Sequence, residues 1–417
     1  MAPQYASKLI YGNEISDWQE RLNTDRMRRE RAERAKRIMR EHGIPALLEA
    51  NSANIRYLTG LKGFNYPMCR YTLFFADDDP VMYEHSGHFH QMPDQAPWIT
   101  EWRPARAWLT AACGIEAAKD EARQFAADIH DELKSRGLLN EKIGFSAFDG
   151  IAREALTNAG VKNLVDFSLV MKEIRKIKTA DEIDCLKTAA AIVEGVWYSI
   201  WEAAKPGVRD TELSGIATKA GYDMGAESAP PGGWRSGPST FDRGFHQSSR
   251  LLQTGDLLYG SLCGLTYQGY ATCTYRTFIV GRKPNAQELD WYKRVKDSID
   301  GVIDAIKPGA TTADAAKHFP PASSWGYDEE CEVLASEIGH GIGLTQGSTN
   351  YDIPIINRQW SLNYPQVFEE GMTIAIESRE GETRVGGVRL ENMVVVTKDG
   401  AEIMDHFPRE EILVAPR

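Results

Sequence analysis

The chain has 417 residues, which is enough for two domains that each have their own core. Hydrophobic residues make up 42% and charged residues 26%, the ordinary composition of a soluble globular protein. The formal net charge of −11 disfavours a nucleic-acid partner or an anionic membrane, because both attract positively charged surfaces.

The N-terminal sequence and the cysteines favour a cytoplasmic protein. No cationic segment followed by an apolar run opens the sequence, and no run of about 18 apolar residues occurs, so we expect neither a secretory signal nor a membrane span. The cysteines are scattered and form no CxxC pair, which is typical of reduced thiols. They are Cys69, Cys113, Cys185, Cys263, Cys273 and Cys331.

Predicted helices and strands alternate in the first part of the chain. A basic run interrupted by Glu30 and Glu33 carries an apolar stripe at helical spacing, which predicts a solvated amphipathic helix. The elements expected are a helix at 26–40, a strand at 44–48, a turn at 54–60, a hairpin at 71–83 and a helix at 117–136. Such alternation predicts a mixed α/β domain over residues 1–172.

A second domain is expected over residues 173–417. It begins with a polar linker at 173–178, after which Thr179 and Glu182 form a capping box that opens a long amphipathic helix. Further helices are predicted at 210–225 and 285–306, and strands dominate from 257 onward.

Four segments of this second domain carry the residues with chemistry. They are GDLLYGSLCGLTYQGYATCTYRTF at 255–278, which predicts a hairpin, IGHGIG at 338–343, EGMTIAIE at 370–377 and VRLEN at 388–392. They place His340 in a glycine-bracketed turn, Glu377 at the end of a buried strand and Glu391 within another strand. Arg389 shares a face with Glu391, so a structural ion pair is the alternative to a functional site.

Together the four segments resemble the pita-bread family, which includes creatinase, prolidase and aminopeptidase P. The resemblance implies an α/β fold with an N-terminal creatinase-like domain and a C-terminal pita-bread domain with a curved antiparallel sheet. It also implies a homodimer in which the N-terminal domain completes the partner's site. Metal-dependent members bind two divalent ions through Asp, Asp, His, Glu and Glu. The last three match His340, Glu377 and Glu391, whereas the first two fall on Leu262 and Cys273.

The loss of both aspartates favours a metal-free site, because Leu262 offers no lone pair to a cation. Creatinase resembles this chain in that respect and works without metal. We therefore expect no cofactor and a metal-independent hydrolase that cleaves a C–N or related bond of a small carboxylate-bearing, zwitterionic metabolite. The metal alternative is a single zinc or iron ion, with Cys263, Cys273, His340, Glu377 and Glu391 as candidate ligands.

Other functions stay open on the same residues. The sequence around 236–240 and 352–362 is similar to that of the dimethylsulfoniopropionate lyases, so the second hypothesis is a lyase with an altered metal site. A further alternative is an Xaa-Pro-type metallopeptidase or a catalytically inactive binding homologue. The family's second histidine corresponds to Tyr351, which makes the peptidase the least favoured of the enzymes.

Without a metal, side chains must move the protons. His340 and His246 are the expected proton carriers, with Glu377 and Glu391 as their catalytic partners. By resemblance to creatinase, Arg70 would hold the substrate carboxylate of the partner subunit. The remaining candidates for substrate binding are Tyr275, Arg276, Tyr351 and Trp234.

Overall fold

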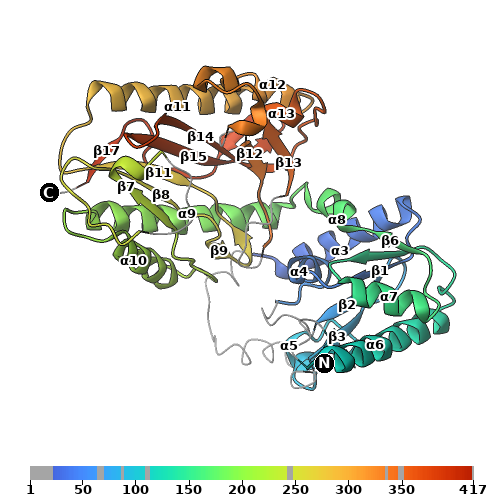
Figure 1. Cartoon of the computed structure of the whole chain (residues 1–417). Coiled ribbons are helices and arrows are strands. Elements are labelled where there is room, and N and C mark those ends of the chain that lie inside the picture. The colour runs from blue at the N-terminus through green and yellow to red at the C-terminus, as the bar shows by residue number, and fades with distance from the viewer. Residues whose placement is uncertain are drawn as a thin grey trace. The chain divides into compact units, whose positions relative to one another are not determined.

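The structure is a computed structural model of the whole chain, and Figure 1 shows how its elements are arranged. It describes residues 22–62, 70–85, 89–108, 113–241, 248–333, 337–345 and 352–415. Two compact units divide the chain, Met1–Ile174 and Arg175–Arg417. The predicted boundary lies two residues earlier, at 172/173.

The first unit is built on one mixed sheet of six strands in the order β4-β3-β2-β1-β5-β6. β1 pairs antiparallel with β2 and parallel with β5, as expected of an α/β domain. The elements are α3 (Thr24–Glu41), β1 (Ala46–Glu49), α4 (Ser52–Thr59), β2 (Tyr71–Phe75), β3 (Val81–Glu84), α5 (Met92–Gln95), β4 (Glu101–Pro104), α6 (Ile115–Ser135), β5 (Ile143–Ser146), α7 (Gly150–Asn158), β6 (Leu164–Asp166) and α8 (Ser168–Arg175). The predicted amphipathic helix, the hairpin and the helix at 117–136 are confirmed as α3, β2–β3 and α6.

Two short segments of this region differ from the prediction. The expected turn at 54–60 is the helix α4, whose first turn is capped by the Asn51 side chain and whose end is Gly60 in the left-handed conformation. The expected polar linker at 173–178 is helical as far as Arg175, because α8 extends into it. Both helices have only eight residues, too few for a periodic pattern to stand out.

The second unit contains two main sheets, ordered β17-β11-β8-β7 and β13-β12-β14-β15-β16, and a small hairpin of β9 and β10. Its elements are α9 (Ala180–Ala203), α10 (Asp210–Asp223), β7 (Gly233–Ser236), η2 (Gly237–Ser239), β8 (Leu257–Ser261), β9 (Thr266–Tyr267), β10 (Tyr270–Ala271), β11 (Tyr275–Val280), α11 (Ala286–Ala305), α12 (Thr312–Ala316), η3 (Ala322–Trp325), η4 (Glu330–Glu332), β12 (Glu337–Gly341), β13 (Asp352–Asn357), α13 (Arg358–Ser361), β14 (Thr373–Glu382), β15 (Gly386–Thr397), β16 (Gly400–Ile403) and β17 (Leu413–Ala415). The capping box of Thr179 and Glu182 is confirmed.

Helices cover both sides of these strands. In Figure 1, α11 runs along β14 and β15 on one side, and α9 and α10 lie on the other. The core between α11 and its strands contains Val295, Ile299 and Val302, which belong to the same hydrophobic cluster as Ile374 and Val394. The predicted α/β fold class is therefore confirmed.

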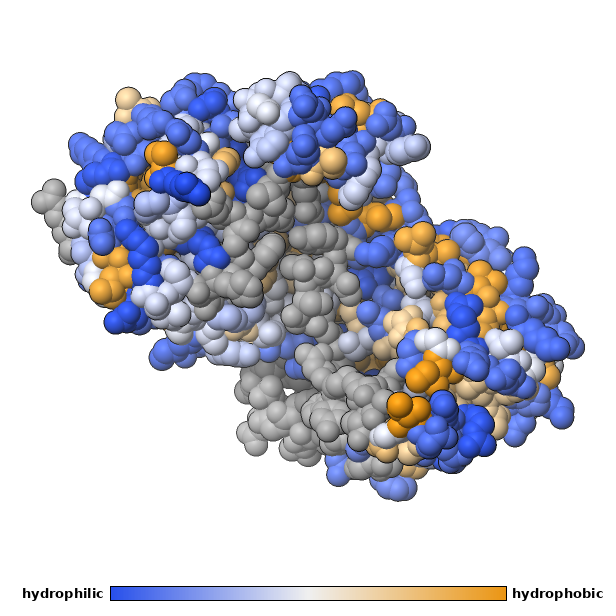
Figure 2. Space-filling view, in the orientation of Figure 1, coloured by the Kyte–Doolittle hydropathy of each residue, from blue (hydrophilic) through white to orange (hydrophobic). Residues whose placement is uncertain are grey.

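The surface agrees with the composition. On the face shown in Figure 2, hydrophilic residues make up most of the coloured area. Among the described residues, no helix is both long enough and apolar enough to cross a membrane.

Glu49 on β1 gives the first unit a pH-dependent stability. Its side chain is fully buried and accepts hydrogen bonds from the Asn51 amide at 2.7 Å and from Asn54 Nδ2 at 2.9 Å. Burial raises the pKa of Glu49 from 4.5 to about 7. Between pH 4.5 and 7 the folded state therefore holds a proton that the unfolded chain has released. The free energy of unfolding falls as the pH rises through this range, and the stability that the protonated Glu49 contributes is lost above pH 7.

We expect Glu49→Gln to remove this dependence. The variant should gain stability relative to the parent as the pH rises from 4.5 to above 7, by a total of about 3 kcal/mol. Urea unfolding at pH 5 and pH 8 measures the difference, and Glu116→Gln on the surface of α6 is the control. A difference that is the same at both pH values would contradict the prediction.

Candidate active site

Two glutamates lie directly opposite each other at the centre of the second unit. Glu377 on β14 pairs with Glu391 on β15, and their exposed fractions are 8% and 0%. His340 pairs with Ala375 on β14. Paired residues and residues two apart along a strand share one face of a sheet, so His340, Glu377 and Glu391 converge. One ligand atom from each of the three lies within 4.8 Å of the others.

The local setting of two of these residues differs from the prediction. His340 lies in the strand β12 and not in a turn. Glu377 stands in the middle of β14 and not at its end. The glycines beside His340 have a packing role, because a Cβ at Gly341 would lie 2.6 Å from the backbone of Asp352.

The hydrogen bond of the His340 ring fixes its tautomer. Nδ1 lies 3.2 Å from the carbonyl oxygen of Gly341, which can only accept, so Nδ1 carries the proton. Nε2 lies 3.6 Å from Glu391 Oε1. In the neutral ring, a lone pair on Nε2 therefore faces a carboxylate oxygen, and a cation between the two atoms makes this arrangement favourable. Such a ring, with Nδ1–H donated to a carbonyl, is typical of metal-binding histidines.

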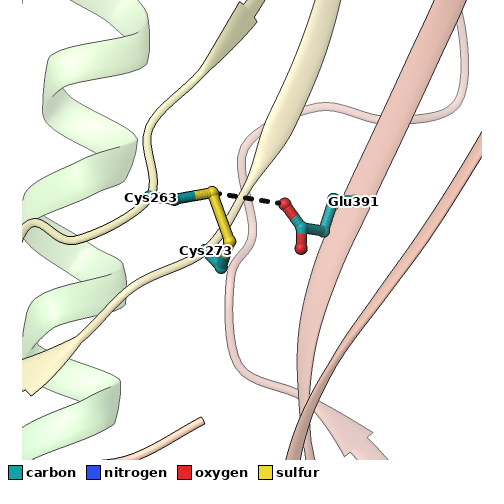
Figure 3. Close-up of side chains that lie close together, drawn as sticks. All are labelled: Cys263, Cys273 and Glu391. Carbon is teal, nitrogen blue, oxygen red and sulfur yellow. Dashed lines mark hydrogen bonds between the residues drawn. A yellow bond between two sulfur atoms is a disulfide. The ribbon is translucent and has the colours of Figure 1, made fainter. Parts of the chain in front are cut away.

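Cys263 and Cys273 are joined in a disulfide beside Glu391 (Figure 3). Cys263 Sγ lies 3.7 Å from Glu391 Oε2, the contact drawn as a dashed line. The prediction of reduced thiols is wrong for this pair, whereas Cys113, Cys185 and Cys331 form no disulfide within the described residues. Cys69 lies outside the described residues.

The side chain that reaches Glu391 from this hairpin belongs to Cys263 and not to its neighbour Leu262. Leu262 is buried, with 3% of its surface exposed, and its amide donates to the carbonyl of Thr274. The next residue, Cys263, is the one whose side chain reaches Glu391. Adjacent residues of an extended segment point to opposite sides, so Leu262 and Cys263 do not both face Glu391, and the match of Leu262 to the family's first aspartate stays a prediction.

The donors present fit a divalent cation. Glu391 belongs to two groups of possible ligands, one with Cys263 and Cys273 and the other with His340 and Glu377. Reduced thiols with an imidazole and carboxylates suit a borderline-soft ion such as Zn²⁺. A disulfide offers no thiolate, so in that state His340, Glu377 and Glu391 are the donors that remain.

A pair of arginines lies beside the two glutamates. Arg379 and Arg389 oppose each other across β14 and β15, two positions from the Glu377–Glu391 pair and therefore on the same face. The guanidinium of Arg389 lies over the rings of Tyr259 and Tyr275, 4.9 and 5.8 Å from their centroids. Within the described residues Arg389 forms no ion pair, so the alternative of an Arg389–Glu391 ion pair is excluded.

Arg276 and Trp234 are buried and make structural contacts, which weighs against their predicted role in substrate binding. Arg276 is 2% exposed, pairs with Asp405 at 2.6 Å and donates to the backbone carbonyl of Glu391, also at 2.6 Å. It therefore positions the backbone that carries Glu391 and not its carboxylate. Trp234 is 1% exposed, its Nε1 donates to the Pro231 carbonyl, and its ring fills the space over Gly260. Of the predicted aromatic contacts, Tyr275 is the one beside the site.

Other predicted residues lie elsewhere. Arg70 belongs to the first unit, where Nε donates to Glu84 Oε2 at 2.6 Å and Nη1 to the Lys62 carbonyl. Its guanidinium thus has a carboxylate within its own unit, which weighs against its role as the holder of a substrate carboxylate. His246 and Tyr351 lie outside the described residues, so their predicted roles stay predictions.

Asp352, the neighbour of Tyr351, is engaged structurally. Its carboxylate contacts Arg175 Nη2 at 3.1 Å and Lys178 Nζ at 3.2 Å. Burial lowers the pKa of Lys178, which the negative charge of Asp352 opposes. Because two cations hold it, Asp352 does not replace the family's second histidine as a proton carrier.

The sequence analysis did not identify Arg379, which lies opposite Arg389 on the same face of the sheet as the two glutamates. The signal was present, because Arg379 follows Glu377 at the same period of two by which Arg389 precedes Glu391.

The chain matches two family models. Residues 184–398, a little more than half of the chain, match metallopeptidase family M24, and residues 31–177 match the creatinase/prolidase N-terminal domain. The uncharacterized peptidase YqhT of Bacillus subtilis is 25% identical over 392 residues, which cover 92% of this chain and 99% of that protein. An Xaa-Pro dipeptidase of Pyrococcus horikoshii is 28% identical over 275 residues, covering 63% of this chain and 72% of that protein.

Solved structures share the fold over nearly the whole chain. An Xaa-Pro dipeptidase from Bacillus anthracis has a TM-score of 0.75 at 24% identity and covers 92% of this chain and 99% of its own. A prolidase from Thermococcus sibiricus has a TM-score of 0.76 at 21% identity, with coverages of 93% and 98%.

These relatives correct the predicted function. The expected metal-independent, creatinase-like hydrolase is wrong, because the relatives are named as Xaa-Pro dipeptidases and the matched family is one of metallopeptidases. The expectation of no metal cofactor is likewise not supported. The chain belongs to metallopeptidase family M24 and is a hydrolytic enzyme of the creatinase and aminopeptidase P superfamily.

Proposed function

We propose that this chain is a metal-dependent hydrolase that cleaves the amide C–N bond of small dipeptides of the Xaa-Pro type. The substrate class comes from the relatives named Xaa-Pro dipeptidase. The observation that carries the proposal is the position of His340 Nε2, which lies 3.6 Å from Glu391 Oε1 with Nδ1 bonded to a carbonyl. This is the arrangement of a ring held ready for a cation.

His340, Glu377 and Glu391 would hold a divalent ion, and the two cysteines, when reduced, would extend the set of donors. When bound, such an ion polarises the scissile carbonyl and lowers the pKa of water. Strands β12, β14 and β15 provide the rigid support, since all three residues lie within the ladder and not on loops.

Glu377 is the better candidate for the proton carrier. Glu391 is fully buried and belongs to both donor groups, which suits a residue committed to cations. Glu377 is 8% exposed, belongs to one group, and stands directly opposite Glu391. It would take the proton of the attacking water and return it to the leaving nitrogen, the amine of proline in an Xaa-Pro substrate.

Arg276 would hold Glu391 in position through contacts with the backbone of β15. Its bonds to Asp405 and to the Glu391 carbonyl fix the strand next to the carboxylate. Asp405 also accepts from Asn392 Nδ2 at 2.9 Å and from the Met393 amide at 2.6 Å, so one buried carboxylate fastens two successive residues of β15.

Replacement of either glutamate should abolish turnover without unfolding the protein. We expect Glu377→Gln and Glu391→Gln to lower the rate of Xaa-Pro hydrolysis by at least about 10²-fold, because each loses a charge needed for proton transfer or cation binding. Steady-state kinetics on a dipeptide such as Ala-Pro measure the effect. The matched control is Glu380→Gln, which changes a glutamate of the same strand on the opposite face, near Arg294. Similar losses in all three variants would contradict the assignment.

Removal of divalent metal should have the same consequence. Protein is purified under reducing conditions and then treated with 1,10-phenanthroline. Its rate of Xaa-Pro hydrolysis should fall at least about tenfold and should recover when Zn²⁺, Mn²⁺ or Co²⁺ is added. Elemental analysis of the same samples gives the metal content per chain. Full activity in protein whose metal content is a small fraction of one ion per chain would sink the proposal.

The lyase reading and the homodimer remain predictions. A parallel assay for dimethyl sulfide released from the sulfonium carboxylate, with the same metal-loaded protein, distinguishes a lyase from the proposed peptidase. Light scattering of the full chain tests the homodimer.

A further inference from the structure

We propose that Cys263 and Cys273 form a redox gate on a cation position that shares Glu391 with the His340 position. As a dithiol the pair supplies two thiolates to a zinc-type ion, and as a disulfide it supplies none. The inference rests on the metal dependence of the proposed function and adds to it a control by the redox state.

The backbone brings the two sulfur atoms together independently of any bond between them. Ser261 at the end of β8 pairs with Tyr275 at the start of β11. Beyond that pair the ladder continues, since the Leu262 amide donates to the Thr274 carbonyl and the Gly264 amide to the Thr272 carbonyl. Cys263 and Cys273, two positions past the last strand pair, therefore face each other whether oxidised or reduced.

Glu391 turns a different oxygen to each donor group. Oε2 lies 3.7 Å from Cys263 Sγ, and Oε1 lies 3.6 Å from His340 Nε2. Ligand atoms around one tetrahedral zinc ion lie roughly 3.3–3.8 Å apart, given metal–ligand distances of about 2.0–2.3 Å. The two contacts thus have the spacing of ligands around cations, and a carboxylate between them can serve two cation positions.

The charges around the glutamates explain why oxidation would release an ion. Glu377, Glu391, Arg379 and Arg389 share one face of the sheet, and their formal charges sum to zero before any cation is counted. Two thiolates would add two negative charges, which one divalent cation neutralises. A disulfide adds no charge, so of the three ligands proposed for the sulfur position Glu391 alone remains in the oxidised state, and one carboxylate does not retain the cation.

The redox step balances with a peroxide as oxidant. Two thiolates give up two electrons and form one sulfur–sulfur bond, and the cation leaves to solvent. Hydrogen peroxide takes up the two electrons and two protons from solvent, its oxygen–oxygen bond breaks, and two water molecules form. A dithiol reductant reverses the step by thiol–disulfide exchange and is itself oxidised to a disulfide. Cys263 is partly exposed whereas Cys273 is buried, so Cys263 is the sulfur that a reagent meets first.

Cobalt substitution tests the gate without any measurement of turnover. The full chain is reduced, freed of reductant and metal under anaerobic conditions, and titrated with Co²⁺. We expect two equivalents to bind and a thiolate-to-cobalt charge-transfer absorption to appear. One equivalent of hydrogen peroxide should remove that absorption, release one equivalent of Co²⁺ and consume two thiols, and a dithiol reductant should restore all three.

Variants assign the effect to the pair. Cys263→Ser and Cys273→Ser should each bind one equivalent of Co²⁺ and lack the charge-transfer band, while Cys185→Ser and Cys331→Ser should behave as the parent. If a serine variant fails to fold, the comparison of reduced and oxidised parent protein still decides the question. A reduced parent that shows no thiolate–cobalt band, or a cobalt content unchanged by oxidation, overturns the inference. Absence of Xaa-Pro hydrolysis with the spectroscopic result intact would overturn only the proposed function.

Discussion

The pairing of Glu377 with Glu391 across β14 and β15 is the constraint on which the site depends. Two buried carboxylates face to face repel each other and lose their hydration, so the strands carrying them must be held by other interactions. The ladder between β14 and β15 supplies part of this, and α11 packs on the outer face of both strands. Burial of the apolar face of these strands against α11 thus offsets the unfavourable free energy of burying the two carboxylates on the other face.

The second sheet fastens β15 from the side. Thr277 of β11 exchanges two hydrogen bonds of 2.9 Å with the backbone of Arg389, and Arg276 binds the carbonyl of Glu391. These contacts act on backbone atoms, so they fix where the side chains of Arg389 and Glu391 begin without occupying their charged ends. Cys263 and Cys273 lie in the segment between β8 and β11. Because β11 also binds the backbone of β15, these strands together set the distance between the sulfur atoms and the Glu391 carboxylate.

The sequence revealed those parts of the fold and candidate site that depend on period and short-range chemistry. The helices with long amphipathic patterns and the Thr179 cap follow from local rules, and alternation along 370–377 and 388–392 indicated which residues share a face. Register between strands is a long-range property, so spacing could not tell whether the side chain of Leu262 or that of Cys263 points to Glu391. The function was misjudged because the match of Leu262 and Cys273 to the family's two aspartates was given more weight than the alternative in which Cys263 and Cys273 bind a cation.

Thiolate and carboxylate differ in one respect that matters at this position. A carboxylate ligand keeps its charge under any physiological oxidant, whereas two thiolates side by side can discard theirs together by forming a bond. In the proposed gate, loss of the thiolate charges would leave two glutamates and two arginines, Arg379 and Arg389, whose formal charges sum to zero before any cation is counted. The arginine pair would therefore offset the charges of the two glutamates after the disulfide has formed and the sulfur-bound ion has left.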